Sequence, residues 1–212
     1  MATGSVTMNP DQTFRMILIA GSLLLFPVAA YYRVRSESTR EPLDRWQEGP
    51  FILFTLRPAG LAYIVGFFAY MIEPSSMAWS SMPLPEWARW VGVCVGAIAG
   101  SLWIWTFRNL GKNLTDTVVT RREHTLVTKG PYRWVRHPFY DAVALSVVAT
   151  SMAAANWFLL LVGGLVFMLM IVRTRMEEEK LLSRFGDSYR AYVERTGRFV
   201  PRIGRAGKGA IT

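Results

Sequence analysis

Residues His124 to Tyr140 read H-T-L-V-T-K-G-P-Y-R-W-V-R-H-P-F-Y and form a polar interval between two apolar parts of the chain. The interval holds a Gly-Pro turn, two tyrosines, a tryptophan, three Lys or Arg side chains and a His-Pro pair. Aromatic rings and polar groups at this density are typical of a ligand-binding site. The interval is therefore our first candidate for such a site, with the flanking apolar segments built around it.

The composition of the whole chain indicates a membrane protein. Of its 212 residues, 51% are hydrophobic and only 18% are charged, whereas soluble domains carry about a quarter charged residues. The net charge of +9 is also compatible with nucleic-acid binding. Because the charges lie between apolar runs, contact with membrane lipids accounts for them better, and we expect no nucleic-acid partner. The single cysteine, Cys94, cannot form an internal disulfide.

Five segments approach the roughly 20 apolar residues that a helix needs to cross about 30 Å of hydrocarbon. They are residues 14–32, 51–72, 87–107, 138–155 and 157–174. The Arg57-Pro58 pair predicts that the second helix is kinked or begins beyond Pro58. Only Asn156 separates the last two segments, which predicts a tight helical hairpin. We therefore expect an all-α, polytopic membrane protein with about five transmembrane helices.

The connections between these segments predict how the chain is oriented. Lys and Arg number four in residues 33–50, none in 73–86, seven in 108–137 and ten in 173–212. Basic residues collect on the cytoplasmic side of a membrane, and five spans place the three basic connections together. We expect the polar interval and the C-terminus in the cytoplasm and the N-terminus on the opposite side. The neutral leader 1–13 lacks a basic n-region, so the first span is expected to be a retained anchor.

A C-terminal amphipathic helix is predicted from Met176 to Thr196. Its apolar residues recur at three- and four-residue spacings, the pattern of a helix lying at the membrane interface. These residues are Leu181, Leu182, Phe185, Tyr189, Tyr192 and Val193. Gly186 weakens the helix, and Asp187-Ser188 offers a start for a second short helix, so one helix and two are both possible. The Gly-rich tail 203–212 is predicted to be mobile.

The Gly130-Pro131 pair predicts a turn. The turn brings backbone N–H and C=O groups beside Tyr132 and Trp134, a combination that suits a flat heterocycle. An ordinary surface turn is the simpler interpretation of the same two residues, so this signal is weak on its own.

The His137-Pro138 pair predicts the start of the fourth helix. Proline is favoured at the first helical position and Asp141 suits the first turn, so a purely structural role is a real alternative for Pro138. His137 can donate to or accept from a polar ligand. Tyr140 follows one helical turn later and should face the same cavity.

Charged residues after the fifth span are candidates for the polar part of a ligand. Because the fourth and fifth segments form a hairpin, Arg173, Glu177 and Glu178 should return beside His137 and Tyr140. Charges near bilayer depth are costly and usually functional. The chain has no strand followed by G-x-G-x-x-G, no P-loop and no G-x-S-x-G elbow. With two distant histidines and one cysteine, we expect no metal site.

Two groups of residues in the second half of the chain form a specific combination. The first is L-V-x-x-G-P-Y-x-x-x-R-H-P-x-Y, from Leu126 to Tyr140, and the second follows the hairpin as Arg173, Glu177, Glu178, Phe185, Gly186, Tyr189, Tyr192 and Pro201. Together they resemble the isoprenylcysteine carboxyl methyltransferase and phospholipid methyltransferase superfamily, integral-membrane enzymes that use S-adenosylmethionine. The resemblance covers roughly residues 108–202, and the N-terminal spans carry no comparable signature.

The resemblance implies a pocket for S-adenosylmethionine lined by Leu126, Val127, Gly130, Pro131, Tyr132, His137, Tyr140 and Glu178. It implies that Arg173 and Glu177 stand where the cofactor meets a lipophilic or lipid-modified substrate delivered by the membrane. A carboxylate acceptor needs only an orienting cation such as Arg173, whereas an amine or thiol needs a proton acceptor, for which Glu177 is the candidate. Many members have glycine where this chain has Ala142, so the resemblance leaves the methyl acceptor open.

The same reasoning divides the chain into regions. Residues 1–107 carry three transmembrane helices, 108–202 form the catalytic region with the hairpin 138–174, and 203–212 are the tail. A membrane reductase of the sterol type that uses NADPH is one alternative, because such enzymes share an R-H-P-x-Y stretch. A non-enzymatic membrane component whose basic face binds anionic lipid is another. Methyl transfer is the leading prediction.

Overall fold

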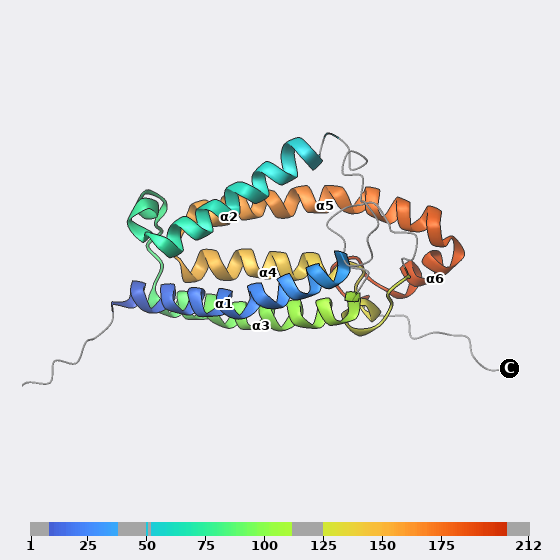
Figure 1. Cartoon of the computed structure of the whole chain (residues 1–212), viewed down its shortest axis with the longest axis horizontal. Helices are drawn as coiled ribbons and strands as arrows, with labels where there is room; N and C mark the ends of the chain where they lie inside the picture. Colours follow the sequence, from blue (N-terminus) through green and yellow to red (C-terminus); the bar gives the residue numbers. More distant parts are fainter. Residues whose placement is uncertain (1–8, 38–49, 51, 112–124, 203–212) are drawn as a thin grey trace, which may run out of the picture.

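The fold is a bundle of long helices that lie side by side, with a short helix, α6, at one end (Figure 1). The computed structural model describes residues 9–37, 50, 52–111 and 125–202, and every named element in these residues is helical. The expected all-α class is therefore confirmed. The predicted mobile tail 203–212 and most of the loop 33–50 lie outside the described residues.

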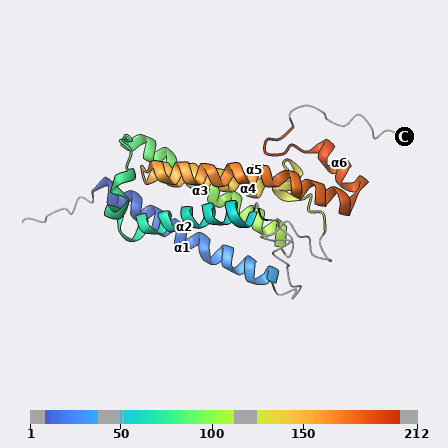
Figure 2. The same cartoon turned by 90° about the horizontal axis from the view of Figure 1, so that it is seen from above.

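Each predicted apolar segment overlaps one helix of the bundle. The helices are α1 (Pro10–Glu37), α2 (Arg57–Ile72), α3 (Glu86–Leu110), α4 (Pro138–Ala153) and α5 (Trp157–Phe185). Four of them, with α2 counted from Leu53, are long and apolar enough to cross a membrane. α4 is a shorter apolar helix of 16 residues, or roughly 24 Å at 1.5 Å per residue. Figure 2 shows α1 at the edge of the bundle.

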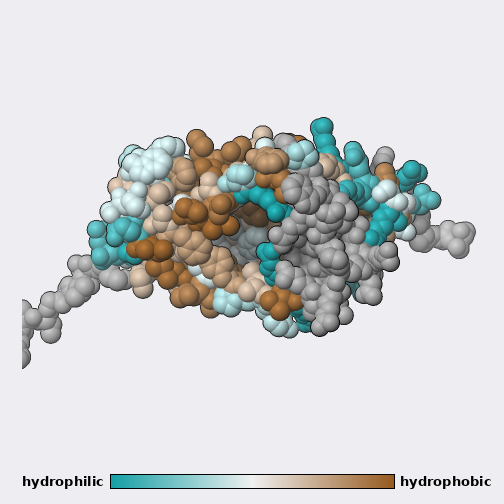
Figure 3. All heavy atoms as spheres, turned by 45° about the horizontal axis from the view of Figure 1, so that its top comes forward, coloured by the Kyte–Doolittle hydropathy of each residue, from teal (hydrophilic) through white to brown (hydrophobic). Residues whose placement is uncertain are grey.

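The outer surface of the bundle is that of an integral membrane protein. Large apolar side chains are exposed on the lipid-facing sides of the helices, among them Leu24, Phe54, Leu61, Leu161 and Met168. Figure 3 shows such residues along one face, with hydrophilic residues gathered toward the two ends. Trp79 and Trp157 are partly exposed and pack edge to face. They lie at the end opposite α6, where tryptophan is favoured at a membrane–water boundary.

The start of α2 is irregular, as the Arg57-Pro58 pair predicts. A π-helical turn, Ile52–Leu56, leads directly into α2, which begins at Arg57 with Pro58 in its first turn. Proline is tolerated there because its missing N–H has no partner in the first turn of a helix. The helix therefore does not begin beyond Pro58, and the irregularity takes the form of the π turn.

α3 and α4 approach each other closely where α3 begins and α4 ends. A Cβ atom on Gly92 of α3 would lie 2.7 Å from the Met152 Cβ of α4, so only glycine fits at this crossing. Ala149 of α4 is fully buried near Gly96 of α3. Small residues at a helix crossing let the two backbones pack tightly inside a membrane.

A turn at Ala154–Asn156 joins α4 to α5 and confirms the predicted tight hairpin. The buried Asn156 side chain accepts a hydrogen bond from the Leu159 N–H (3.1 Å) and so caps α5. Its amide nitrogen donates to the Ser80 hydroxyl (2.7 Å) in the 3-10 helix η3 (Pro74–Ser80). One side chain thus ties the hairpin to the connection between α2 and α3.

α5 runs without a break to Phe185, and α6 (Asp187–Arg195) follows after Gly186. Gly186 has a φ of +50°, a left-handed conformation that favours glycine. Of the two possibilities for residues 176–196, the structure therefore has two helices. The first half of that segment extends α5, and the second half is α6, which lies at the same end of the bundle as the start of α4 (Figure 1).

We predict that Asn156→Ala lowers the free energy of unfolding by about 1–3 kcal/mol, because a buried N–H at the start of α5 loses its acceptor. Thermal unfolding of the detergent-solubilised protein measures the loss. Ser101→Ala is the matched control, since the exposed Ser101 hydroxyl donates within its own helix to the Ala97 carbonyl. An equal loss in both variants would contradict the role of Asn156.

Candidate functional site

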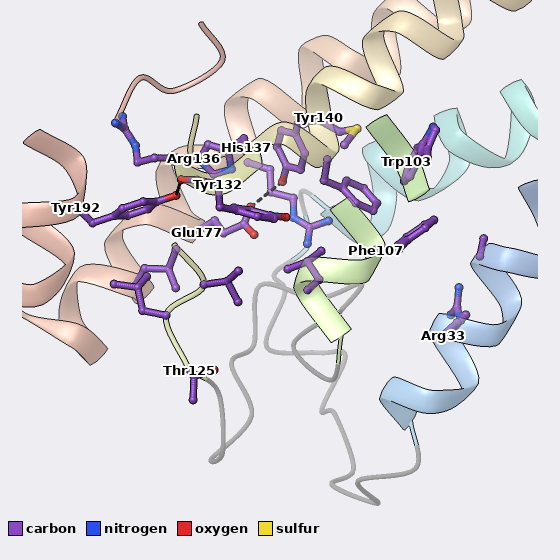
Figure 4. Close-up of a pocket in the computed structure, with 18 of the residues that line it drawn as sticks. Arg33, Trp103, Phe107, Thr125, Tyr132, Arg136, His137, Tyr140, Glu177 and Tyr192 are labelled. Carbon is purple, nitrogen blue, oxygen red and sulfur yellow. Dashed lines mark hydrogen bonds between the residues drawn. The ribbon is translucent and has the colours of Figure 1, made fainter. Parts of the chain in front are cut away.

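A cavity of about 590 Å³ opens at the end of the bundle where α4 begins and α5 ends. Its walls come from α1 to α6 and from the polar interval (Figure 4). Tyrosines, His137, Arg136, Arg173 and Glu177 line one part, and aliphatic and aromatic side chains of α1 to α4 line the other. The cavity thus offers both polar and apolar surface to a ligand.

The Gly-Pro turn is a short 3-10 helix, η5 (Gly130–Arg133), that is fastened to the end of α3. Gly130 has a φ of +62°, and a Cβ atom there would lie 2.3 Å from the Asn109 side-chain nitrogen. Both the backbone conformation and the close approach require glycine. The turn holds the buried Tyr132 against the cavity.

A segment after α6 pairs with the polar interval just before α4. We call residues 196–199 the C-terminal strap. The Arg136 N–H donates to the Gly197 carbonyl (2.9 Å), the Gly197 N–H to the Trp134 carbonyl (3.0 Å), and the His137 N–H to the Arg198 carbonyl (3.1 Å). This pairing fixes the extended backbone that presents His137 at the start of α4.

Glu178 on α5 is the centre of an ionic cluster beneath the cavity. One carboxylate oxygen accepts from Arg136 Nε (2.9 Å) and lies 3.1 Å from His137 Nε2. The guanidinium of Arg198, from the strap, also donates to this carboxylate. The hydrogen bond to Glu178 raises the pKa of Arg198 and so further stabilises its charged form. Three segments distant in sequence meet at one carboxylate.

His137 is buried between two aromatic rings. Its ring centroid lies 5.2 Å from that of Tyr140 and 5.8 Å from that of Phe199 in the strap. Since a carboxylate only accepts hydrogen bonds, the contact with Glu178 assigns a proton to His137 Nε2. The Tyr140 hydroxyl donates to Glu177 (2.7 Å), so both glutamates are held by residues of the H-P-x-Y stretch.

The α6 helix contributes two buried tyrosines to the cavity wall, Tyr189 and Tyr192. The Tyr192 hydroxyl donates to the Tyr132 carbonyl (2.7 Å) and thus locks α6 onto η5. Burial raises the pKa of Tyr192 to about 12 and raises that of Tyr132 well above its ordinary value. These phenols therefore remain neutral hydrogen-bond donors at physiological pH.

The apolar part of the cavity is walled by aromatic rings. Trp103 and Phe107, one turn apart on α3, stack at 5.1 Å, and Trp103 meets Phe139 of α4 edge to face at 4.7 Å. Ile64 of α2 and Met170 of α5 add aliphatic surface. In Figure 4, Arg33 of α1 lies on the far side of these rings from Tyr192. This wall suits the hydrocarbon part of a lipophilic molecule.

The structure brings together most of the residues that the sequence singles out. Seven of them line the cavity: Leu126, Val127, Tyr132, His137, Tyr140, Arg173 and Glu177. Gly130 and Pro131 form the turn that carries Tyr132, and Glu178 lies behind His137 in the ionic cluster. Their assignment to cofactor or substrate stays a prediction.

Sequence reasoning missed the aromatic wall and the strap. The spacing of Trp103 and Phe107 by four residues is a signal of a shared helix face, but any apolar membrane helix carries such pairs. Nothing in the residues around Arg198 and Phe199 indicates that they return to the start of α4. That contact follows from the turn at Gly186, which directs α6 back across the site.

We predict that Glu178→Gln lowers the free energy of unfolding by about 2–4 kcal/mol, because the substitution removes the only charge that Arg136 and Arg198 share in this cluster while keeping the size of the side chain. Thermal unfolding in detergent measures the change. Glu179→Gln, at the adjacent exposed position, should change stability by less than about 0.5 kcal/mol. Comparable losses in both variants would argue against the cluster.

A family model for isoprenylcysteine carboxyl methyltransferases matches residues 90–183. Protein-S-isoprenylcysteine O-methyltransferase of Schizosaccharomyces pombe is 34% identical over 96 residues, which make up 44% of this chain and 41% of that protein. Methanethiol S-methyltransferase of Mycobacterium tuberculosis is 36% identical over 70 residues, 33% of this chain and 28% of that protein. Each of these two matches thus spans less than half of the relative's own length.

The fold has a counterpart among solved structures. The eukaryotic intramembrane Ras methyltransferase, an isoprenylcysteine carboxyl methyltransferase, aligns with a TM-score of 0.61 at 22% identity, over 93% of this chain and 70% of that one. At this identity the likeness concerns the arrangement of helices. It extends the similarity to the N-terminal helices, which the matched family residues do not reach.

Proposed function

We propose that this chain, which belongs to the isoprenylcysteine carboxyl methyltransferase superfamily, transfers a methyl group from S-adenosylmethionine to the carboxylate of a lipophilic, lipid-modified acceptor. The observation that carries the proposal is that one cavity joins a polar wall of tyrosines, His137 and Glu177 to an aromatic wall at Trp103 and Phe107. A polar cofactor and an apolar acceptor must meet in one site for methyl transfer, and the two walls suit these two molecules.

The residues of the polar part fit S-adenosylmethionine chemically. The cofactor carries a flat base, ribose hydroxyls, a sulfonium and an amino-acid group, so its site needs aromatic surface together with donors and acceptors. Tyr132, His137 and Tyr140 supply aromatic rings, and the Glu177 carboxylate supplies negative charge for a cationic group. Leu126 and Val127 add apolar surface from the segment before η5.

Catalysis by this chain rests on positioning. When bound, S-adenosylmethionine supplies a methyl group already activated by its positive sulfur. Arg173 and Glu177, one turn apart on α5, both line the cavity, and we assign to Arg173 the orientation of the acceptor carboxylate. Correct orientation alone supplies about 7–11 kcal/mol of barrier reduction in favourable cases. A carboxylate is already a nucleophile at neutral pH, so this acceptor needs no general base.

A thiol acceptor is the second candidate, and the methanethiol S-methyltransferase relative favours it. A thiol must lose its proton before or during attack, and Glu177 is the carboxylate available for that step. The Tyr140 hydroxyl donates a hydrogen bond to Glu177 (2.7 Å). When Glu177 takes up the thiol proton, this hydrogen bond must either persist or be replaced. Membership in the methyltransferase superfamily favours either acceptor over reduction by NADPH.

We further propose that the cavity and the C-terminus face the cytoplasm, on the strength of the basic residues in 33–50, 108–137 and 173–212. A protease site appended after Thr212 should be cut in inside-out membrane vesicles and protected in right-side-out vesicles. Immunoblotting of the appended tag measures the cleavage. Cleavage only in right-side-out vesicles would reverse the orientation, which leaves the chemistry of the site unchanged.

We predict that the purified protein transfers labelled methyl from S-adenosylmethionine to an S-farnesylated cysteine derivative, and that Arg173→Ala lowers the rate on the order of 100-fold, because the acceptor loses its orienting cation. Arg175→Ala is the matched control, since Arg175 is an exposed neighbour on α5 and should retain the rate within about twofold. Scintillation counting of the extracted product gives the rates.

The product identifies the acceptor atom. A methyl ester releases its label as volatile methanol in base, whereas a methyl thioether keeps it. Base-labile label supports the carboxylate, and base-stable label on a thiol substrate supports the second candidate. If the folded protein binds no S-adenosylhomocysteine in calorimetry and transfers no label to either acceptor, the proposed function is wrong.

A further inference from the structure

Tyr189 is a buried polar residue whose hydroxyl lacks a hydrogen-bond partner in the part of the chain that the structure describes. It lies in the first turn of α6, where its N–H donates to the Gly186 carbonyl (3.1 Å), and its ring packs against Tyr192 with centroids 6.1 Å apart. Only 3% of the residue is exposed, yet it lines the cavity.

Tyr192 provides a direct contrast on the same helix. It is equally buried, at 3% exposure, and lines the same cavity, but its hydroxyl donates to the Tyr132 carbonyl. The Tyr192 hydroxyl therefore has a backbone acceptor, whereas the Tyr189 hydroxyl has no acceptor among the described residues. A buried hydroxyl without a partner lowers stability, and native structures keep few such groups.

The surroundings of Tyr189 indicate that its hydroxyl acts as a donor. Burial raises the pKa of Tyr189, and the neighbouring Glu178 raises it further, so the phenol keeps its proton. Arg136 and Arg198 of the adjacent ionic cluster carry donors only and cannot accept a hydrogen bond from this phenol. The group thus lies at the cavity wall and needs an acceptor from outside the described protein atoms.

We propose that the Tyr189 hydroxyl binds the cofactor by donating a hydrogen bond to an acceptor atom of S-adenosylmethionine in the polar part of the cavity. This inference rests on the proposed function, and it adds a cofactor-binding residue to those that the sequence predicts. The acceptor atom belongs either to the amino-acid part or to the nucleoside part of the cofactor, and both parts offer oxygen or nitrogen lone pairs.

The test compares Tyr189→Phe with Tyr192→Phe in the full-length, detergent-solubilised protein by two measurements. Without ligand, Tyr189→Phe should unfold at the same temperature as the wild type or higher, because no protein hydrogen bond is lost. Tyr192→Phe should unfold at a lower temperature, because the buried Tyr132 carbonyl loses its donor. A loss of stability in Tyr192→Phe but not in Tyr189→Phe separates a structural hydroxyl from a ligand-binding one.

With ligand, calorimetry gives the Kd for S-adenosylhomocysteine and for 5′-methylthioadenosine, which lacks the amino-acid part. Tyr189→Phe should weaken S-adenosylhomocysteine binding by roughly five- to tenfold, the loss of one buried hydrogen bond. A loss confined to S-adenosylhomocysteine supports a contact to the amino-acid part, and an equal loss for both ligands supports a contact to the nucleoside part.

Unchanged affinity of Tyr189→Phe for both ligands, with the wild type binding normally, overturns this inference alone and leaves an ordered water as the partner of the hydroxyl. A Tyr189→Phe protein that is less stable without ligand overturns it as well, because the hydroxyl would then have a structural partner. If the folded wild type binds neither S-adenosylhomocysteine nor 5′-methylthioadenosine, both the proposed function and this inference are wrong.

Discussion

The Glu178 carboxylate is the contact on which the site depends. It joins α5 to Arg136 and His137 of the polar interval and to Arg198 of the C-terminal strap, three segments that the chain reaches at different times. When two guanidinium groups share a largely buried carboxylate, removing any one of these groups leaves a buried charge without compensation and destabilises the cluster. The cluster therefore holds these three segments together as one wall of the site, and its contact with Glu178 orients the His137 ring.

The fold could be predicted largely from the lengths of the apolar segments. Runs such as 87–107 and 157–174 have few alternatives to a membrane helix, because an unpaired backbone is too costly in hydrocarbon. The single asparagine at position 156 was enough to predict the hairpin. Helix ends were less predictable: α5 passes through Glu177, Glu178 and Glu179 to Phe185, because helical hydrogen bonding continues wherever the side chains can reach water or partners.

The candidate site likewise has residues that the sequence predicts and residues that it does not. Residues within one local motif, such as His137 and Tyr140, are placed by helical periodicity, and the hairpin brings Glu177 and Glu178 back to them. Arg198 and the aromatic pair at Trp103 and Phe107 reach the site through tertiary contacts that no local pattern encodes. The left-handed conformation of Gly186 sets the direction of α6 and the strap. A glycine in the sequence indicates that a turn is possible but not its direction.

The strap also fixes the order in which the protein can become functional during synthesis. Residues 196–199 lie some forty positions beyond the start of α5, whereas the polar interval that they pair with precedes α4. All five helices α1 to α5 therefore precede the strap in the chain, and the backbone of Trp134 to His137 lacks its partner until the strap is made. A chain that ended before Thr196 would keep the sequences of all five helices but would lack the residues that complete the cavity wall at His137.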